Sequence, residues 1–224
     1  IAVVDANNDI RLLELQEAEE IERIIEELCT ECGTWADTII RDIAVCADLN
    51  VYFAKARLAE QMHAFPPTLT DDGVILLKKA RHPLIPYKKA VPISFTLGDT
   101  YQALIITGPN TGGKTVALKT CGLLTLMAMS GMLIPAAEGS RISVFNNVLA
   151  DIGDTQSIEQ NLSTFSAHMR SVIEILEQAD RHSLVLLDEL GSGTDPIEGA
   201  ALAEAVIQRL KDNGAKLMVT THYQ

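Results

Sequence analysis

Several features that would assign a protein to other classes are missing from this sequence. No uncharged apolar run reaches the length of about 18 residues that a membrane-spanning helix needs. The first residues, IAVVDANNDIRLLE, lack the basic lead and the uninterrupted apolar stretch of a secretory signal. With 47% hydrophobic and 21% charged residues in a chain of 224, the sequence predicts one main core with an appendage. We therefore expect a cytoplasmic protein that does not associate with a membrane.

Basic charge is also scarce. The 18 lysine and arginine residues face 30 aspartate and glutamate residues, which gives a net charge of −12. A surface that binds the phosphate backbone of a nucleic acid carries an excess of basic side chains. We expect any nucleic acid contact to depend on a few local basic residues or on regions outside this chain.

The four cysteines do not form a disulfide framework. They are scattered at positions 29, 32, 46 and 121, as is typical of reduced thiols in a reducing compartment. Cys29 and Cys32 form a CxxC pair, but no second CxxC is present and the pair lies in a predicted helix. A redox or zinc role and a plain structural role on a helix face both remain open.

Residues 1–65 carry helical periodicity. Apolar residues at 21, 24, 25 and 28 make one stripe among many glutamates, and Gly33 interrupts the pattern. Thr34, with Asp37 three residues on, predicts a capped start for a second helix that runs toward Met62. The two stripes predict an antiparallel helical pair, and the prolines at 66 and 67 end it.

From residue 70 to residue 224 the pattern is that of an α/β domain. The short apolar runs GVILLKK, QALIIT, SLVLLD and KLMVTT are mostly separated by helical stretches. Runs of this kind predict a mixed, mainly parallel sheet covered by helices on both faces. The chain stops directly after the last run, so we expect it to be an excised piece of a longer protein.

A glycine-rich turn follows the run QALIIT. Residues 108–115 read GPNTGGKT and match the phosphate-loop pattern G-x-x-x-x-G-K-[ST], with a predicted strand before and a predicted helix after. Backbone N–H groups of such a turn and the following helix start attract phosphate. Lys114 is then expected to reach the terminal phosphates and Thr115 to bind magnesium. The alternative is a glycine-rich turn that carries a lysine by chance.

Acidic residues complete the expected site. Asp188 and Glu189 follow the run SLVLL, where a carboxylate can hold magnesium and a second can activate the attacking water. This pair favours hydrolysis over phosphate transfer to another substrate, although Glu189 could simply solvate a strand end. His222 ends the last predicted strand and is able to donate to a γ-phosphate, whereas a lone histidine is often structural.

The sequence as a whole resembles the ATPase domain of the MutS family, which consists of ABC-type P-loop ATPases. The segments ARHPLI (80–85), TGPNTGGKT, STF (163–165), LLDELGSGTD and TTHY carry the resemblance. The details DIGDTQSIEQNLSTFSAHM and DELGSGTDPIEGAAL are similar to the second bacterial branch, which has a C-terminal Smr nuclease domain. The resemblance implies that residues 1–65 are the remnant of a lever and clamp.

The resemblance also implies roles for individual residues. It makes Asp188 the magnesium-binding acid, Glu189 the water-activating acid, His222 the switch histidine and Ser163 a contact to the nucleotide of the opposite subunit. Ser163 and Thr164 are expected to precede a helix, and a plain helix cap is the alternative. The residues expected to bind ATP and Mg²⁺ are Gly108, Pro109, Asn110, Thr111, Gly112, Gly113, Lys114, Thr115, Asp188, Ser163 and His82.

One position departs from the family. Where relatives carry an aromatic residue that stacks on adenine, this chain has Ala90 in the run KKAVPIS. Tyr87 and His82 are the two candidates to replace it.

The family resemblance implies a homodimeric ATPase that drives a clamp. Its target is branched DNA, in suppression of recombination, or collided ribosomes, in ribosome quality control with rRNA contacts. Contacts to either target, and an Smr-type endonuclease, are expected in regions mostly outside this chain. The alternative is a structural clamp in which ATP binding, rather than turnover, is the functional event.

Overall fold

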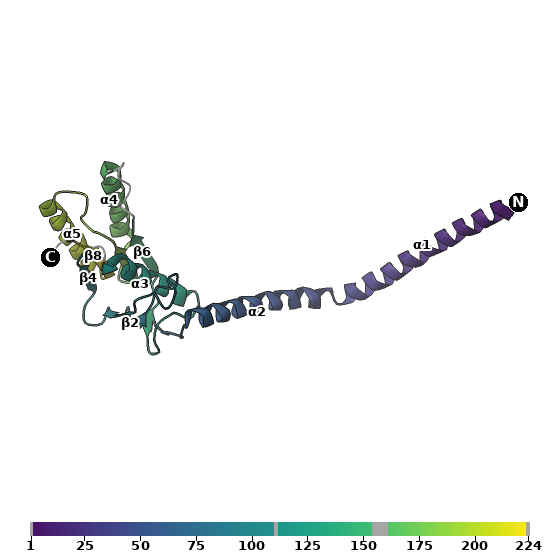
Figure 1. The fold of residues 1–224 in the computed structure, drawn as a ribbon, viewed down its shortest axis with the longest axis horizontal. Coiled ribbons are helices and arrows are strands. Elements are labelled where there is room, and N and C mark those ends of the chain that lie inside the picture. Colours follow the sequence, from purple (N-terminus) through teal and green to yellow (C-terminus); the bar gives the residue numbers. More distant parts are fainter. Residues whose placement is uncertain (1, 110–111, 154–160, 223–224) are drawn as a thin grey trace. The chain divides into compact units, whose positions relative to one another are not determined.

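The computed structural model describes residues 2–109, 112–153 and 161–222 (Figure 1). The chain divides into two units, one that ends at Ala54 and one that begins at Lys55. The second unit therefore includes the last two turns of a helix that starts in the first. The assignment of the N-terminal residues to a lever or clamp stays a prediction.

The N-terminal helices are α1 (Ala2–Thr34) and α2 (Ala36–Met62). The two helices are confirmed, but the break between them is at Trp35, two residues beyond the Gly33 that the sequence indicates. The expected cap at Thr34 is wrong, because its hydroxyl donates to the carbonyl of Glu31 at 2.6 Å, one turn back in α1. A threonine hydroxyl bonded in this way remains inside a helix rather than starting one.

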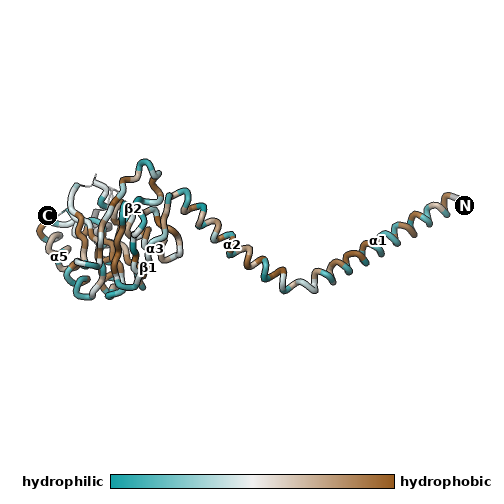
Figure 2. Tube along the Cα trace, turned by 90° about the horizontal axis from the view of Figure 1, so that it is seen from below, coloured by the Kyte–Doolittle hydropathy of each residue, from teal (hydrophilic) through white to brown (hydrophobic). Residues whose placement is uncertain are grey.

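The apolar stripes of these helices are exposed to solvent. Ile24 is 43% exposed and Ile25 54%, and in the second helix Ile43 is 64% exposed. Figure 2 shows hydrophobic and hydrophilic residues alternating along both helices. The packing expected of an antiparallel pair is therefore not formed among the described residues. No helix in the described ranges has the length and apolar character required to cross a membrane.

The second unit contains two sheets rather than the single mixed sheet that the sequence predicts. The first has the order β1-β5-β2-β3 and mixes parallel and antiparallel pairs; its strands are Thr68–Thr70, Arg141–Ser143, Ile75–Ala80 and Ile93–Leu97. The second has the order β4-β8-β7-β6 and is fully parallel; its strands are Ala103–Thr107, Lys216–Thr221, Ser183–Leu187 and Asn147–Asp151. The predicted α/β class with parallel strands is confirmed, and the run GVILLKK (73–79) contributes to the mixed sheet.

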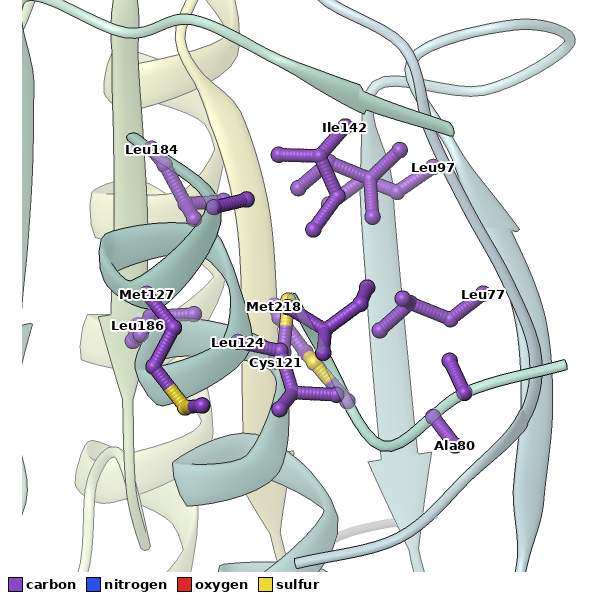
Figure 3. Packing of buried hydrophobic residues seen from close by; sticks show 14 of the residues in the cluster. Leu77, Ala80, Leu97, Cys121, Leu124, Met127, Ile142, Leu184, Leu186 and Met218 are labelled. Carbon is purple, nitrogen blue, oxygen red and sulfur yellow. The ribbon is translucent and has the colours of Figure 1, made fainter. Parts of the chain in front are cut away.

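Helix α3 (Lys114–Met129) contributes to a core that contains residues of both sheets. Its buried Cys121 and Leu124 belong to one cluster with Leu77 of the mixed sheet and Met218 of the parallel sheet (Figure 3). Burial raises the pKa of the Cys121 thiol to about 12, so this cysteine stays protonated and acts as a small apolar residue. Strands of both sheets thus bury side chains in the cluster that contains α3.

Helices α4 (Asn161–Gln178) and α5 (Pro196–Asp212) cover the opposite face of the parallel sheet. Strand β7 shows why both faces need a cover: Leu184 and Leu186 join the cluster around α3, whereas Val185 and Leu187 join the cluster with α4 and α5. Alternate side chains of a strand point to opposite faces, so a strand buried on both sides is apolar throughout.

A backbone contact at Gly98 offers a test of the packing between strand ends. Gly98 has φ +92°, and a Cβ there would lie 2.1 Å from the carbonyl oxygen of Gly73. Because a backbone atom cannot move aside as a side chain can, we expect Gly98→Ala to destabilise the protein by about 2 kcal/mol or more. Thermal and urea denaturation measure this change. Gly33→Ala, where no atom lies within 4 Å, is the control and leaves the stability unchanged or slightly higher. Equal stability of the two variants would contradict the close approach.

Candidate functional site

The residues singled out in the sequence follow three strands of the parallel sheet. The glycine-rich loop follows β4, Asp188 and Glu189 follow β7, and His222 follows β8. Strand β8 pairs in parallel with both β4 and β7, so all three strands end at the same edge. This edge of an open parallel sheet is where α/β proteins bind their ligands.

The loop has the backbone of a turn that only glycine adopts freely. Gly108 has φ 134° and Gly113 φ 77°, both in the region unfavourable to side chains. The Gly112 N–H donates to the carbonyl of Pro109 at 3.1 Å, and the Gly113 carbonyl accepts from Ala117 at 2.9 Å. Helix α3 therefore begins directly after Gly113. Asn110 and Thr111 lie outside the described residues.

Lys114 is the first residue of α3 and is only 5% exposed. Its ammonium group donates to the carbonyl of Gly108 and lies 3.4 Å from the carbonyl of Thr221. Among the described residues it forms no ion pair with a carboxylate. A buried cation whose partners are carbonyl dipoles keeps most of its charge uncompensated, so this pocket favours an anion.

Asp188 is fixed by a residue that the sequence analysis did not identify. Asp188 is 6% exposed, and its Oδ1 accepts from the hydroxyl of Thr220 at 2.5 Å. The same hydroxyl accepts from the backbone N–H of Glu189 at 2.8 Å. Thr220 is the first residue of the segment TTHY and lies near the end of β8. The pairing of β8 with β7 brings it to this position.

The His222 ring contacts both Glu189 and Lys114. Nε2 of His222 is 3.4 Å from Oε1 of Glu189, and its Nδ1 is 3.5 Å from the Lys114 ammonium. The Glu189 side chain is 18% exposed and that of His222 is 40% exposed. Glu189 also has φ 50°, an unusual value for a residue with a side chain. The structure thus brings the lysine, the second acid and the histidine together, and their roles stay predictions.

Ser163 lies in the first turn of α4 rather than before it, so the expectation that Ser163 and Thr164 precede the helix is wrong. The same helix carries His168, whose Nδ1 is 2.9 Å from Oδ2 of Asp151 at the end of β6. The sequence analysis identified neither His168 nor Asp151 as a candidate. Since the Asp188 N–H donates to the Asp151 carbonyl at 2.9 Å, this contact connects α4 to the strand end beside Asp188.

A cavity of about 310 Å³ adjoins the glycine-rich loop. It is lined by His82, Ile85, Ala90, Gly112, Gly113 and Val116, among others. Burial, and then the charge of Lys119, lower the pKa of His82 and favour a neutral ring. Its Nδ1 accepts from the N–H of Leu84 at 3.3 Å, so the neutral ring carries its proton on Nε2.

Tyr87 is not part of this cavity. Its ring lies 4.4 Å from the guanidinium carbon of Arg81, and the ring of His63 contacts it edge-on at 4.6 Å. It lines a different cavity, between the end of α2 and α3. Of the two candidates that the sequence offered in place of an aromatic at position 90, His82 is the one next to the loop.

Comparison with known proteins identifies the class. A family model described as MutS domain V matches residues 104–224, which include all but the first residue of β4, the glycine-rich loop, both acids and His222. The chain belongs to the MutS family, in its second branch, MutS2. It is 56% identical to the Endonuclease MutS2 of Lachnospira eligens over 99% of this chain, and 55% identical to that of Caldanaerobacter subterraneus subsp. tengcongensis over 100%. The chain spans 28% of the length of each of these relatives.

Proposed function

We propose that this chain binds and hydrolyses ATP at the edge formed by the ends of β4, β7 and β8. The observation that carries the proposal is the buried Lys114 ammonium, which carbonyl groups hold at the edge of the sheet where Asp188 and Glu189 follow β7. A positive pocket at a helix start suits the phosphates, and neighbouring acids suit a metal ion and a water. The family match over the same residues supports this assignment.

Each side chain of the site has a separate role in ATP hydrolysis. Lys114 exchanges its carbonyl partners for the terminal phosphate oxygens, and the loop around Gly112 and Gly113 offers backbone N–H groups to the remaining phosphates. Glu189 orients the attacking water and accepts its proton. His222, between Lys114 and Glu189, donates through Nε2 to the terminal phosphate once its contact with Glu189 opens.

The residues present fit a magnesium ion. The Asp188 carboxylate and the half-buried Thr115 hydroxyl are the oxygen donors that this ion prefers, and both lie at the phosphate-binding edge. Bound there, Mg²⁺ neutralises charge on the phosphate oxygens. The adenine ring then occupies the cavity beside the loop, where the neutral His82 ring takes the place of the aromatic residue that relatives have at position 90.

The nucleotide is shared between two copies of the chain. Ser163 reaches the ATP bound by Lys114 of the partner copy, and the free N–H groups of the first turn of α4 help to hold its phosphates. The proposal is supported by the position of Ser163 on a helix that lies in sequence between the glycine-rich loop and Asp188. This arrangement is a closed homodimer with two composite sites.

Mixing two inactive variants tests the shared site. Lys114→Ala and Ser163→Arg are each expected to lose at least about 90% of ATP turnover. A mixed dimer retains one composite site with both residues intact, so we expect it to recover a substantial part of the activity of one site. Steady-state phosphate release, with heterodimer content measured by native mass spectrometry, gives the result. Confirmed heterodimers without recovery would show that Ser163 does not act across the interface.

The hydrolysis drives a clamp that acts on branched DNA or on collided ribosomes, through contacts mostly outside this chain. The net charge of −12 supports that division, because an acidic surface repels a phosphate backbone. ATP turnover of the protein, measured alone, with branched duplex DNA and with stalled ribosomes, separates the targets. Stimulation identifies the target, whereas nucleotide binding without turnover supports a structural clamp that is gated by binding alone.

A further inference from the structure

Thr220 places a polar hydroxyl in an apolar stretch of β8. Thr220 is fully buried in β8, where the three preceding residues, 217–219, are buried and apolar. A buried hydroxyl is unfavourable unless it is hydrogen-bonded, so an aliphatic residue is the ordinary choice in an interior strand. This hydroxyl makes two bonds, one to Asp188 at 2.5 Å and one to Glu189 at 2.8 Å.

The two bonds restrain different parts of the site. As a donor to Oδ1, the hydroxyl fixes the rotation of the Asp188 carboxylate. As an acceptor from the Glu189 N–H, it holds the backbone at a residue whose φ of 50° is unfavourable for a side chain. The Thr220 carbonyl also accepts from Leu190 at 3.1 Å, so three consecutive residues after β7 are tied to one residue of β8.

We infer that Thr220 is a positioning residue for both acids of the site. The inference rests on the proposed ATPase function. The hydroxyl aims the Asp188 carboxylate at the metal ion and keeps Glu189 in the backbone conformation that presents its side chain beside His222. Groups that orient metal ligands typically change metal affinity or activity by about 10- to 100-fold when they are removed.

The test compares three replacements in the purified protein. Thr220→Val keeps the shape and removes the hydroxyl, Thr220→Ser keeps the hydroxyl, and Thr220→Ala differs from the serine variant by the hydroxyl alone. Thr125→Val is the matched control, because the buried Thr125 hydroxyl donates to a carbonyl inside α3, at Cys121, at 2.8 Å. Circular dichroism and thermal melting establish that each variant is folded.

Two quantities are measured: the Mg²⁺ concentration that gives half-maximal binding of a fluorescent ATP analogue, and kcat for ATP. For Thr220→Val we expect the Mg²⁺ requirement to rise about tenfold and kcat to fall by about 10-fold or more, with metal-free nucleotide affinity unchanged. Thr220→Ser and Thr125→Val are expected to stay within about twofold of the original protein. A merely structural role would lower the melting temperature without moving the Mg²⁺ requirement.

Other outcomes overturn the inference. A folded Thr220→Val protein with an unchanged Mg²⁺ requirement and kcat would show that the hydroxyl positions nothing. Equal losses in the serine and alanine variants would assign the effect to the lost methyl group, and this comparison decides even where the valine variant fails to fold. If the original protein itself binds no nucleotide in a Mg²⁺-dependent way, the proposed function fails instead.

Discussion

Lys114→Ala is expected to weaken MgATP binding by about 100-fold or more, which is the largest single effect on the site. The Lys114 ammonium group is a positive charge that can bind the phosphates inside the pocket. Each charge-assisted hydrogen bond to phosphate contributes about 1.5 to 3 kcal/mol to the binding free energy. Because the buried cation has carbonyl groups and the His222 ring as partners, and no carboxylate among the described residues, we expect that its removal does not lower the melting temperature and can raise it. Nucleotide titration and thermal melting measure the two effects.

Lys211→Ala is the matched control for charge. Lys211 is an exposed lysine in the last turn of α5, which ends just before β8 begins and so lies at the opposite edge of the sheet. We expect the Lys211→Ala variant to bind nucleotide with the same affinity as the original protein. Unchanged affinity in Lys114→Ala would mean that the phosphates bind elsewhere, and a large drop in melting temperature would indicate a structural lysine.

Glu189→Gln is expected to separate binding from turnover. The amide keeps the size of the side chain and removes the proton acceptor, so kcat falls by about 10²- to 10⁴-fold while ATP affinity stays within a few fold. Because ATP then persists in the site, a dimer that closes on ATP accumulates in the closed state. Rapid-quench measurement of hydrolysis and sedimentation with and without ATP test the two parts.

Glu204→Gln, an exposed glutamate of α5, controls for the loss of a negative charge and is expected to have no effect. Turnover that persists in Glu189→Gln would assign water activation to another group. Loss of turnover without ATP-dependent dimers would leave the catalytic role in place and contradict the closed dimer. The two variants at Lys114 and Glu189 thus fail at different steps, binding in one and hydrolysis in the other.

The class of fold and most of the site were predictable because the signals are local. The glycines at 108 and 113 take the positive φ values that a phosphate-binding turn requires, and α3 begins at Lys114 directly after them. Asp195 caps α5 by accepting from the Ile197 and Glu198 N–H groups at 2.9 and 3.4 Å, with Pro196 first in the helix. Such features depend on neighbours in sequence, so the sequence contains them.

The sequence alone determined that this protein has a glycine-rich turn before a helix, two acids after a buried strand and a histidine after another. The tertiary structure decided which other residues contact these groups. The Thr220 hydroxyl reaches Asp188 and the Glu189 N–H only because β8 pairs with β7. The division into two sheets, both of which contribute to the core around α3, is likewise a property of the tertiary structure. His82 rather than Tyr87 borders the loop because Arg81 and His63 hold the tyrosine ring elsewhere. Contacts between residues far apart in sequence depend on strand order and packing, which no local pattern specifies.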